Sequence, residues 1–233
     1  MEPSPQKAKH KQIPPTKQPQ SVLEEGSRGY NLLRDKLPFD LMLEISNLCK
    51  EWYSANPIKL SEPIFQKDDK KNDKKRRQIG LKKVIGKDLY KKLQLLINLA
   101  INEIYPDHVT ERPGKLLISL PGCSMQKLHM DFREADEPKL VQLPIFIGIM
   151  YSHVDIVTNQ ELFDRKYTRV YYNTGDMVIM NGNQLHRGCS YESLNMRLYF
   201  YAANKDVRDN NIDGKNSYTQ PGKEIPERHP SHS

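Results

Sequence analysis

Five short segments in the second half of the chain constrain its fold more than any other feature. They are rich in Ile, Val and aromatic residues, and Gly, Asn, Pro and Asp separate them, which is typical of β-strands joined by turns. No helical pattern alternates with them, so the sequence predicts a mainly antiparallel sandwich or barrel and not a parallel sheet. The segments are KLLISL (115–120), LVQLPIFIGIM (140–150), YTRVYY (167–172), DMVIM (176–180) and MRLYFYA (196–202).

The residues that precede these strands have a helical period. From Asp88 to Ile104 the apolar side chains recur at the spacing of one buried helix face, which predicts a long helix packed on the core. A shorter helix is expected within LPFDLMLEISNLCKEWYSA, residues 37–55. Helices first and strands afterwards indicate a β core with the helices packed against its outside.

Both ends of the chain have the composition of disordered tails. Residues 1–28 are rich in Pro, Gln, Lys and Ser, and residues 204–233 are similarly polar. We therefore expect one folded domain over residues 29–203, with a helical part at 29–112 and a β core at 115–203.

Several features favour an intracellular location, nuclear or cytoplasmic. The N-terminus lacks the apolar segment of a secretory signal, and no apolar run approaches the roughly 20 residues that cross a bilayer. The three cysteines, Cys49, Cys123 and Cys189, are odd in number and widely spaced, which favours free thiols in a reducing compartment. We expect no membrane partner.

The positive charge of the chain is concentrated in one segment. Residues 67–92 contain twelve Lys and Arg against four Asp, a net charge of +8, in a chain whose total is +7. Within it, the apolar-free run QKDDKKNDKKRRQ predicts a solvated basic loop at residues 66–79. Such a run is most often a solvated face, but it also suits nuclear import, a nucleic acid or an acidic protein. The candidate nucleic-acid contacts are Lys74, Lys75, Arg76 and Arg77.

The last predicted strand presents two different faces. Because side chains alternate along a strand, its apolar residues share one face and its polar residues the other. If the helices cover the apolar face, an arginine and two tyrosines point into the interior. A buried arginine needs an anionic partner, either a protein carboxylate or a bound anion. The apolar residues are Leu198, Phe200 and Ala202, and the polar ones are Arg197, Tyr199 and Tyr201.

The chain contains two His-x-Asp pairs, about as many as chance alone gives for a short motif. In a strand, residues i and i+2 project the same way, so such a pair supplies two ligands of the two-His, one-carboxylate site of non-haem iron oxygenases. His186 lies 55 residues after Asp131, which leaves room for the strands that close a small barrel. This spacing favours His129, Asp131 and His186 as the metal ligands. The other pair, His153 and Asp155, is expected at a loop or strand edge.

Three segments together resemble the iron(II)/2-oxoglutarate-dependent dioxygenases of the phytanoyl-CoA and prolyl hydroxylase-like type. They are PGCSMQKLHMDF, GDMVIMNGNQLHRG and NMRLYFYA. These proteins carry His-x-Asp, a distal His and then an Arg or Lys ten to fourteen residues later; here Arg197 follows His186 by eleven. The resemblance covers residues 115–203 and implies a double-stranded β-helix core, of the jelly-roll or cupin-like kind.

The resemblance also implies a set of ligands. Iron would be bound by His129, Asp131 and His186, and 2-oxoglutarate would chelate that iron. Arg197 would bind the distal carboxylate of 2-oxoglutarate, because a planar guanidinium suits bidentate carboxylate recognition. Gln126 and Tyr199 are further candidate contacts of 2-oxoglutarate. Tyr199 departs from the pattern, since many members have a small hydroxyl residue at that position.

The implied reaction is the hydroxylation of an organic substrate, or its demethylation by way of hydroxylation, with dioxygen as the other co-substrate. Asp131 argues against the halogenating relatives, which lack this carboxylate. Ala203 stands where AlkB-type demethylases carry a second Arg, which argues against that subgroup. A nucleic acid, a protein and a small molecule remain open as substrates. The alternatives are a non-catalytic module of the same fold that binds nucleic acid, and a cupin-like metalloprotein that does not use 2-oxoglutarate.

Overall fold

The computed structural model of the chain describes residues 29–56, 62–63, 74–110, 112–131, 142–157, 167–182 and 184–205. Nearly all of both predicted tails and the part of the basic loop up to residue 73 lie outside these ranges. Within the described ranges, no helix is long and apolar enough to cross a membrane.

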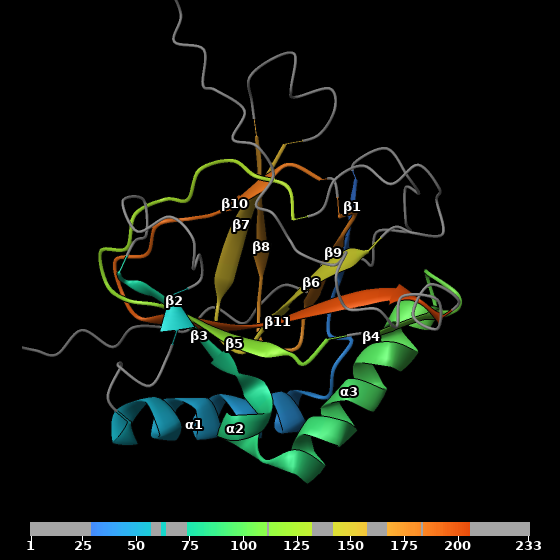
Figure 1. Ribbon diagram of the computed structural model, residues 1–233, viewed down its shortest axis with the longest axis horizontal. Coiled ribbons are helices and arrows are strands. Elements are labelled where there is room, and N and C mark those ends of the chain that lie inside the picture. The colour runs from blue at the N-terminus through green and yellow to red at the C-terminus, as the bar shows by residue number, and fades with distance from the viewer. Residues whose placement is uncertain are drawn as a thin grey trace, which may run out of the picture.

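Two antiparallel sheets form the core of the structure (Figure 1). The larger has eight strands in the order β1-β9-β6-β11-β5-β3-β2, with β4 also paired to β11, and the smaller has the order β10-β7-β8. The larger sheet comprises β1 (Tyr30–Leu33), β2 (Glu62–Pro63), β3 (Arg76–Gly80), β4 (His108–Thr110), β5 (Lys115–Ser119), β6 (Leu143–Gly148), β9 (Met177–Met180) and β11 (Asn195–Asn204). The smaller comprises β7 (Ser152–Ile156), β8 (Thr168–Tyr172) and β10 (His186–Gly188).

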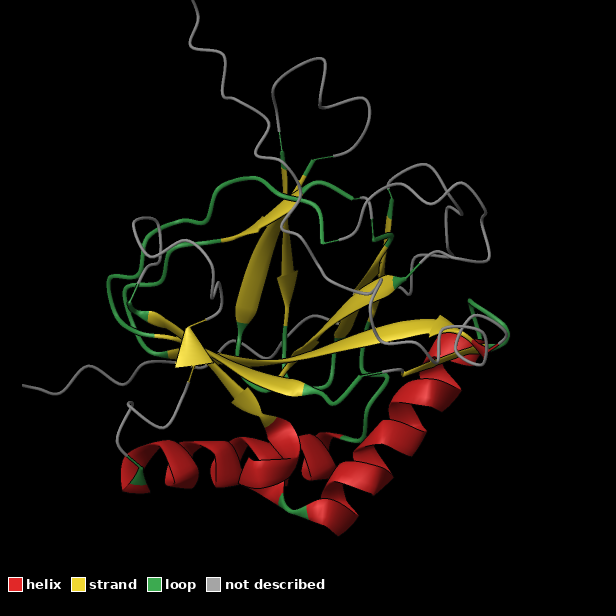
Figure 2. Cartoon of the chain, in the orientation of Figure 1, coloured by secondary structure: helices red, strands yellow, loops and turns green. Residues whose placement is uncertain are grey.

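Three helices cover the outer face of the larger sheet, as the sequence predicts (Figure 2). They are α1 (Phe39–Ala55), α2 (Leu81–Ile85) and α3 (Lys87–Asn102). The buried stripe of α3, which includes Leu93 and Ile97, packs in one apolar cluster with Leu198 and Phe200 of β11. Burial of such side chains contributes about 2 kcal/mol each, which fixes the sheet face that the helices take.

The opposite face of the larger sheet meets the smaller sheet in a second apolar cluster. Phe146 and Val178 from the larger sheet pack there against Val154, Ile156 and Tyr172 from the smaller one. The alternation predicted for β11 is therefore confirmed, because its apolar residues lie on the helix side. Its polar residues face the space between the sheets, where the candidate site lies.

Several strands do not follow from the sequence pattern. Strands β1, β3 and β4 lie within the stretch expected to be helical, and residues 76–79 form part of β3 and not of a solvated loop. The physical reason is pairing: β3 is hydrogen-bonded between β2 and β5, so its backbone is satisfied whatever the charge of its side chains. His153 and Asp155 lie on β7, the central strand of the smaller sheet, and not at a loop or strand edge.

Candidate metal centre

His129, Asp131 and His186 come together on the inner side of the β core. Their ligand atoms all lie within 4.8 Å of one another. His129 Nε2 is 3.8 Å from Asp131 Oδ1, and His186 Nε2 is 3.6 Å from Asp131 Oδ2. Among the described residues, no other group of three or more His, Cys, Asp or Glu side chains is arranged to hold an ion. The set selected by order and spacing is thus the set that the fold assembles.

Backbone pairing brings the two imidazoles together. The amide of each histidine donates a hydrogen bond to the carbonyl oxygen of the other, and both N–O distances are 3.0 Å. His186 begins β10, whose register opposite β7 places its side chain on the same inner face as Ile156. The ring centroids consequently lie 4.6 Å apart.

In both histidines, a contact made by Nδ1 orients the ring so that Nε2 is available to bind a metal. Nδ1 of His129 lies 2.8 Å from the carbonyl oxygen of Lys127, and Nδ1 of His186 lies 2.9 Å from that of Gln184. A proton on Nδ1 donates to that carbonyl and leaves the Nε2 lone pair directed at the cluster. Burial and the neighbouring His186 lower the pKa of His129 to about 4, so this ring is in the neutral form that binds metals.

Tyr199 is bound to the carboxylate of the cluster. Its hydroxyl donates a hydrogen bond to Asp131 Oδ2, and its ring packs against Tyr201 with centroids 4.7 Å apart. The sequence places Tyr199 on the correct face but suggests a contact with 2-oxoglutarate. In the structure the hydroxyl is hydrogen-bonded to one of the candidate ligands, a contact that strand alternation alone does not reveal, and a contact with 2-oxoglutarate stays a prediction.

Arg197 lies among polar side chains and is only 3% exposed. Its Nη1 donates to Ser119 Oγ at 3.1 Å and to Asn195 Oδ1 at 3.3 Å. Among the described residues, no carboxylate pairs with it. An inward-facing arginine without such a partner in this part of the chain has a charge that a bound anion would compensate.

A second unsatisfied group, missed by the sequence analysis, lies near this arginine. The hydroxyl of Tyr172 on β8 is fully buried and makes no hydrogen bond of good geometry within the described part of the chain, where the Ser152 hydroxyl is a nearby polar group. Burial raises the pKa of Tyr172, and the positive charge of Arg197 opposes that rise. Nothing in the sequence distinguishes Tyr172 from the other tyrosines of the run YTRVYY.

Gln126 joins the loop that carries His129 to strand β10. Its side-chain Oε1 accepts a hydrogen bond from the backbone amide of Gly188 at 2.8 Å. Its backbone amide donates to the carbonyl oxygen of Gly188 at 2.9 Å. A Cβ added to Gly188 would overlap Oε1 of Gln126, so a larger residue there would require the Gln126 side chain to shift.

The second His-x-Asp pair has a structural role. Asp155 is fully buried and pairs with Arg169 Nε at 2.7 Å and with Arg187 Nε at 3.2 Å. Burial by itself would raise the pKa of Asp155, but hydrogen bonds from Arg169, Cys189 and Arg187 outweigh it and lower that pKa. Cys189 is buried, as expected, and burial together with Asp155 raises the pKa of its thiol to about 12.

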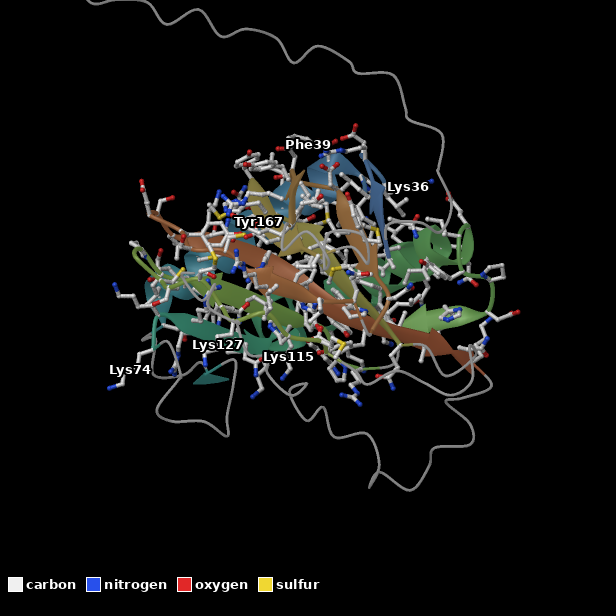
Figure 3. All side chains as sticks on the ribbon, turned by 90° about the horizontal axis from the view of Figure 1, so that it is seen from above. Lys36, Phe39, Lys74, Lys115, Lys127 and Tyr167 are labelled. Carbon is white, nitrogen blue, oxygen red and sulfur yellow. The ribbon has the colours of Figure 1, made fainter. Side chains whose placement is uncertain are left out.

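The four basic candidates for nucleic-acid contact do not share one surface. Lys74 and Lys75 are exposed, Arg77 is half-buried and Arg76 is buried. Figure 3 shows Lys74 on the same edge of the molecule as Lys115 and Lys127. Any surface role of the basic segment therefore falls on the lysines and Arg77.

Comparisons with known proteins find similarity in structure. No protein-family model matches the sequence, and no curated protein matches it. The non-heme alpha ketoglutarate dependent carbocyclase SnoK from nogalamycin biosynthesis matches with a TM-score of 0.61 and 12% identity, over 76% of this chain and 80% of that one.

Two further structures match over similar lengths. The epimerase SnoN, in complex with Fe3+, alpha ketoglutarate and nogalamycin RO, has a TM-score of 0.57 and 11% identity, and covers 86% of this chain and 92% of its own. A Pseudomonas putida prolyl-4-hydroxylase has a TM-score of 0.53 and 13% identity, and covers 77% and 94%. The chain therefore has the fold of the iron/2-oxoglutarate-dependent oxygenases, and the expected mainly β, jelly-roll architecture with flanking helices is confirmed.

Proposed function

We propose that this protein is an iron(II)/2-oxoglutarate-dependent dioxygenase that hydroxylates an organic substrate, or demethylates it by way of hydroxylation. One observation carries the proposal: a two-His, one-carboxylate cluster shares the inner face of the sheet with a buried arginine that has no described carboxylate partner. This donor set is typical of non-haem iron. The fold shared with oxygenases of this class supports it.

The residues of the cluster fit a ferrous ion. His129, Asp131 and His186 would hold it through Nε2, a carboxylate oxygen and Nε2, on one side of the ion. When bound, iron and 2-oxoglutarate supply the oxidation: dioxygen is divided between succinate, formed with loss of CO2, and a substrate C–H bond that becomes C–OH. The chain contributes two imidazoles and a carboxylate that its own hydrogen bonds hold in place, on the inner side of the β core.

Arg197 and Tyr172 fit the distal carboxylate of 2-oxoglutarate. A guanidinium offers several N–H donors in a plane, of which only Nη1 is used within the described residues. The Tyr172 hydroxyl supplies a neutral donor that is otherwise unsatisfied. Ser119 accepts from Arg197 and orients it. Gln126, fastened to Gly188, would border the cofactor from the side of the metal-binding loop.

We propose three classes of substrate for this reaction: a nucleic acid, a protein or a small molecule. For a nucleic acid, the exposed cations Lys74 and Lys75 and the half-buried Arg77 are the contacts that the structure leaves at the surface. Affinity through such residues falls steeply with salt, because binding releases counterions from the phosphates.

The experiment that tests the proposed function is succinate formation by protein purified without air. We expect the protein to contain iron and to convert 2-oxoglutarate to succinate when Fe(II) and dioxygen are supplied, with a faster rate once a true substrate is added. His129→Ala is the control and should give only background succinate. Iron binding without any binding of 2-oxoglutarate would favour a cupin-like metalloprotein instead, and absence of both would favour a non-catalytic module.

Tyr199→Phe should weaken metal binding without unfolding the protein. The hydroxyl restrains Asp131, and loss of a hydrogen bond to a ligating carboxylate typically costs about 10-fold in metal affinity. Titration with Co(II), followed by its visible absorption, measures the dissociation constant. Tyr171→Phe is the control, because Tyr171 is an exposed tyrosine of β8 that stacks on Tyr151. Equal effects of the two substitutions on Co(II) affinity would contradict a specific role of the Tyr199 hydroxyl.

A further inference from the structure

We propose that Arg76 is a positioning residue that fastens together the two backbone segments carrying the metal ligands. The inference rests on the proposed metal centre. It concerns a residue of the basic segment whose side chain points into the protein, where it is only 2% exposed. It acts on the candidate ligands through the segments that carry them, because its hydrogen bonds go to the backbone carbonyls of those segments and to Ser119.

The guanidinium of Arg76 makes hydrogen bonds to three separate segments. Nε and Nη2 donate to the Ser124 carbonyl oxygen at 3.0 and 2.6 Å. Nη2 also donates to the carbonyl oxygens of Gly188 at 3.3 Å and Cys189 at 2.5 Å. Nη1 donates to Ser119 Oγ on β5 at 3.4 Å. One side chain thus bonds to β5, to the loop after it and to the end of β10.

These acceptors flank the candidate ligands in the sequence. Ser124 lies five residues before His129, and Gly188 follows His186 by two. The two segments also meet through the paired amides of His129 and His186. Arg76 therefore adds a further link between the two segments, beyond the one that Gln126 makes with Gly188. This link limits how far the two imidazoles can move apart.

The contact requires an arginine and lies close against Gly188. A planar guanidinium presents five N–H donors in a fixed fork, whereas a lysine ammonium is a compact charge that cannot reach all these oxygens in one geometry. A Cβ on Gly188 would lie 3.1 Å from Arg76 Nη1 and would overlap Gln126 Oε1. The fit of these three residues is therefore close.

Arg76 and Arg197 also share one acceptor. Both donate through Nη1 to Ser119 Oγ, at 3.4 and 3.1 Å. Two buried cations on one hydroxyl raise the local positive potential, which also favours a dicarboxylate nearby. Charge and geometry can be separated, because Arg76→Lys keeps the charge and loses most of the hydrogen bonds.

The test compares Arg76→Gln and Arg76→Lys with wild type by Co(II) titration and by thermal unfolding of the metal-free protein. We expect both variants to bind Co(II) about 10-fold more weakly or worse, with Lys no better than Gln. Arg34→Gln is the control: Arg34 is half-exposed, pairs with Asp176 at 2.6 Å and, within the described ranges, has no recorded contact with either ligand segment. It should lower the unfolding temperature while leaving Co(II) affinity unchanged.

Distinct outcomes separate the possibilities. Arg76 variants that unfold at lower temperature but bind Co(II) as wild type does would overturn the inference, because Arg76 would then be purely structural. If neither Arg76 variant folds, Gly188→Ala disturbs the same contact without removing the charge and should weaken Co(II) binding by a similar factor; unchanged binding would again overturn it. A wild-type protein that binds no Co(II) would overturn the metal centre itself, and this inference with it.

Discussion

Asp131→Ala abolishes metal binding while the protein stays folded. We expect the Co(II) dissociation constant to rise by more than about 100-fold, since even contacts that only support a ligand are worth 10- to 100-fold. Asp131 is the one carboxylate of the cluster, and two neutral imidazoles do not by themselves compensate the charge of a divalent ion. Succinate formation from 2-oxoglutarate should fall to background in the same variant.

Asp155→Ala is the control, because Asp155 belongs to the other His-x-Asp pair. Removing this buried carboxylate leaves Arg169 and Arg187 unpaired and should lower the free energy of unfolding by on the order of 3 kcal/mol. Its Co(II) affinity should match that of wild type. The reverse pattern, with metal binding lost from Asp155→Ala and kept in Asp131→Ala, would show that the wrong pair has been assigned.

Arg197→Gln should remove most of the affinity for 2-oxoglutarate and leave the affinity for metal intact. Loss of a buried, charge-assisted contact costs about 2–5 kcal/mol, which at 1.4 kcal/mol per tenfold corresponds to a dissociation constant raised by about 30- to 4,000-fold. Calorimetric titration of 2-oxoglutarate into Mn(II)-loaded protein measures it. The unliganded variant should be no less stable than wild type, because a buried cation without a carboxylate partner disfavours folding.

Tyr172→Phe tests the same site and should have a smaller effect on the affinity for 2-oxoglutarate than Arg197→Gln. It removes a hydroxyl that is unsatisfied within the described residues, so we expect no loss of stability and a several-fold weaker binding of 2-oxoglutarate. If Arg197→Gln bound 2-oxoglutarate as wild type does, the pocket would not be the carboxylate site. A metalloprotein that uses no 2-oxoglutarate would then account better for the fold.

The long helix and the last strand show why part of this fold can be predicted. In α3 the apolar spacing from Leu89 onward has one buried face, and the helix it predicts is present within two residues of its expected ends. In β11 the alternation of Leu198 and Phe200 with Arg197 separates the helix-covered face from the inner one. Periodicity works here because each element buries one continuous face.

The short strands show where prediction from periodicity fails. β10 has three residues and β7 mixes Ser, His and Asp with apolar side chains, so neither contains a readable alternation. Both exist because neighbouring strands satisfy their backbone, which is a property of partners that are distant in sequence.

The metal centre likewise has features that the sequence predicts and features that only the structure shows. The sequence by itself identified the candidate residues: side-chain chemistry, order and spacing favour His129, Asp131 and His186, and the family resemblance adds Arg197. Only the tertiary structure decided what those residues touch: Tyr199 holds Asp131, Tyr172 lies near Arg197, and Arg76 turns inward from a charged segment. The physical reason is that the capacity of a side chain to bind a metal depends on its own chemistry, which the sequence shows directly. Its burial and its hydrogen-bond partners arise only when strands far apart in the chain pair.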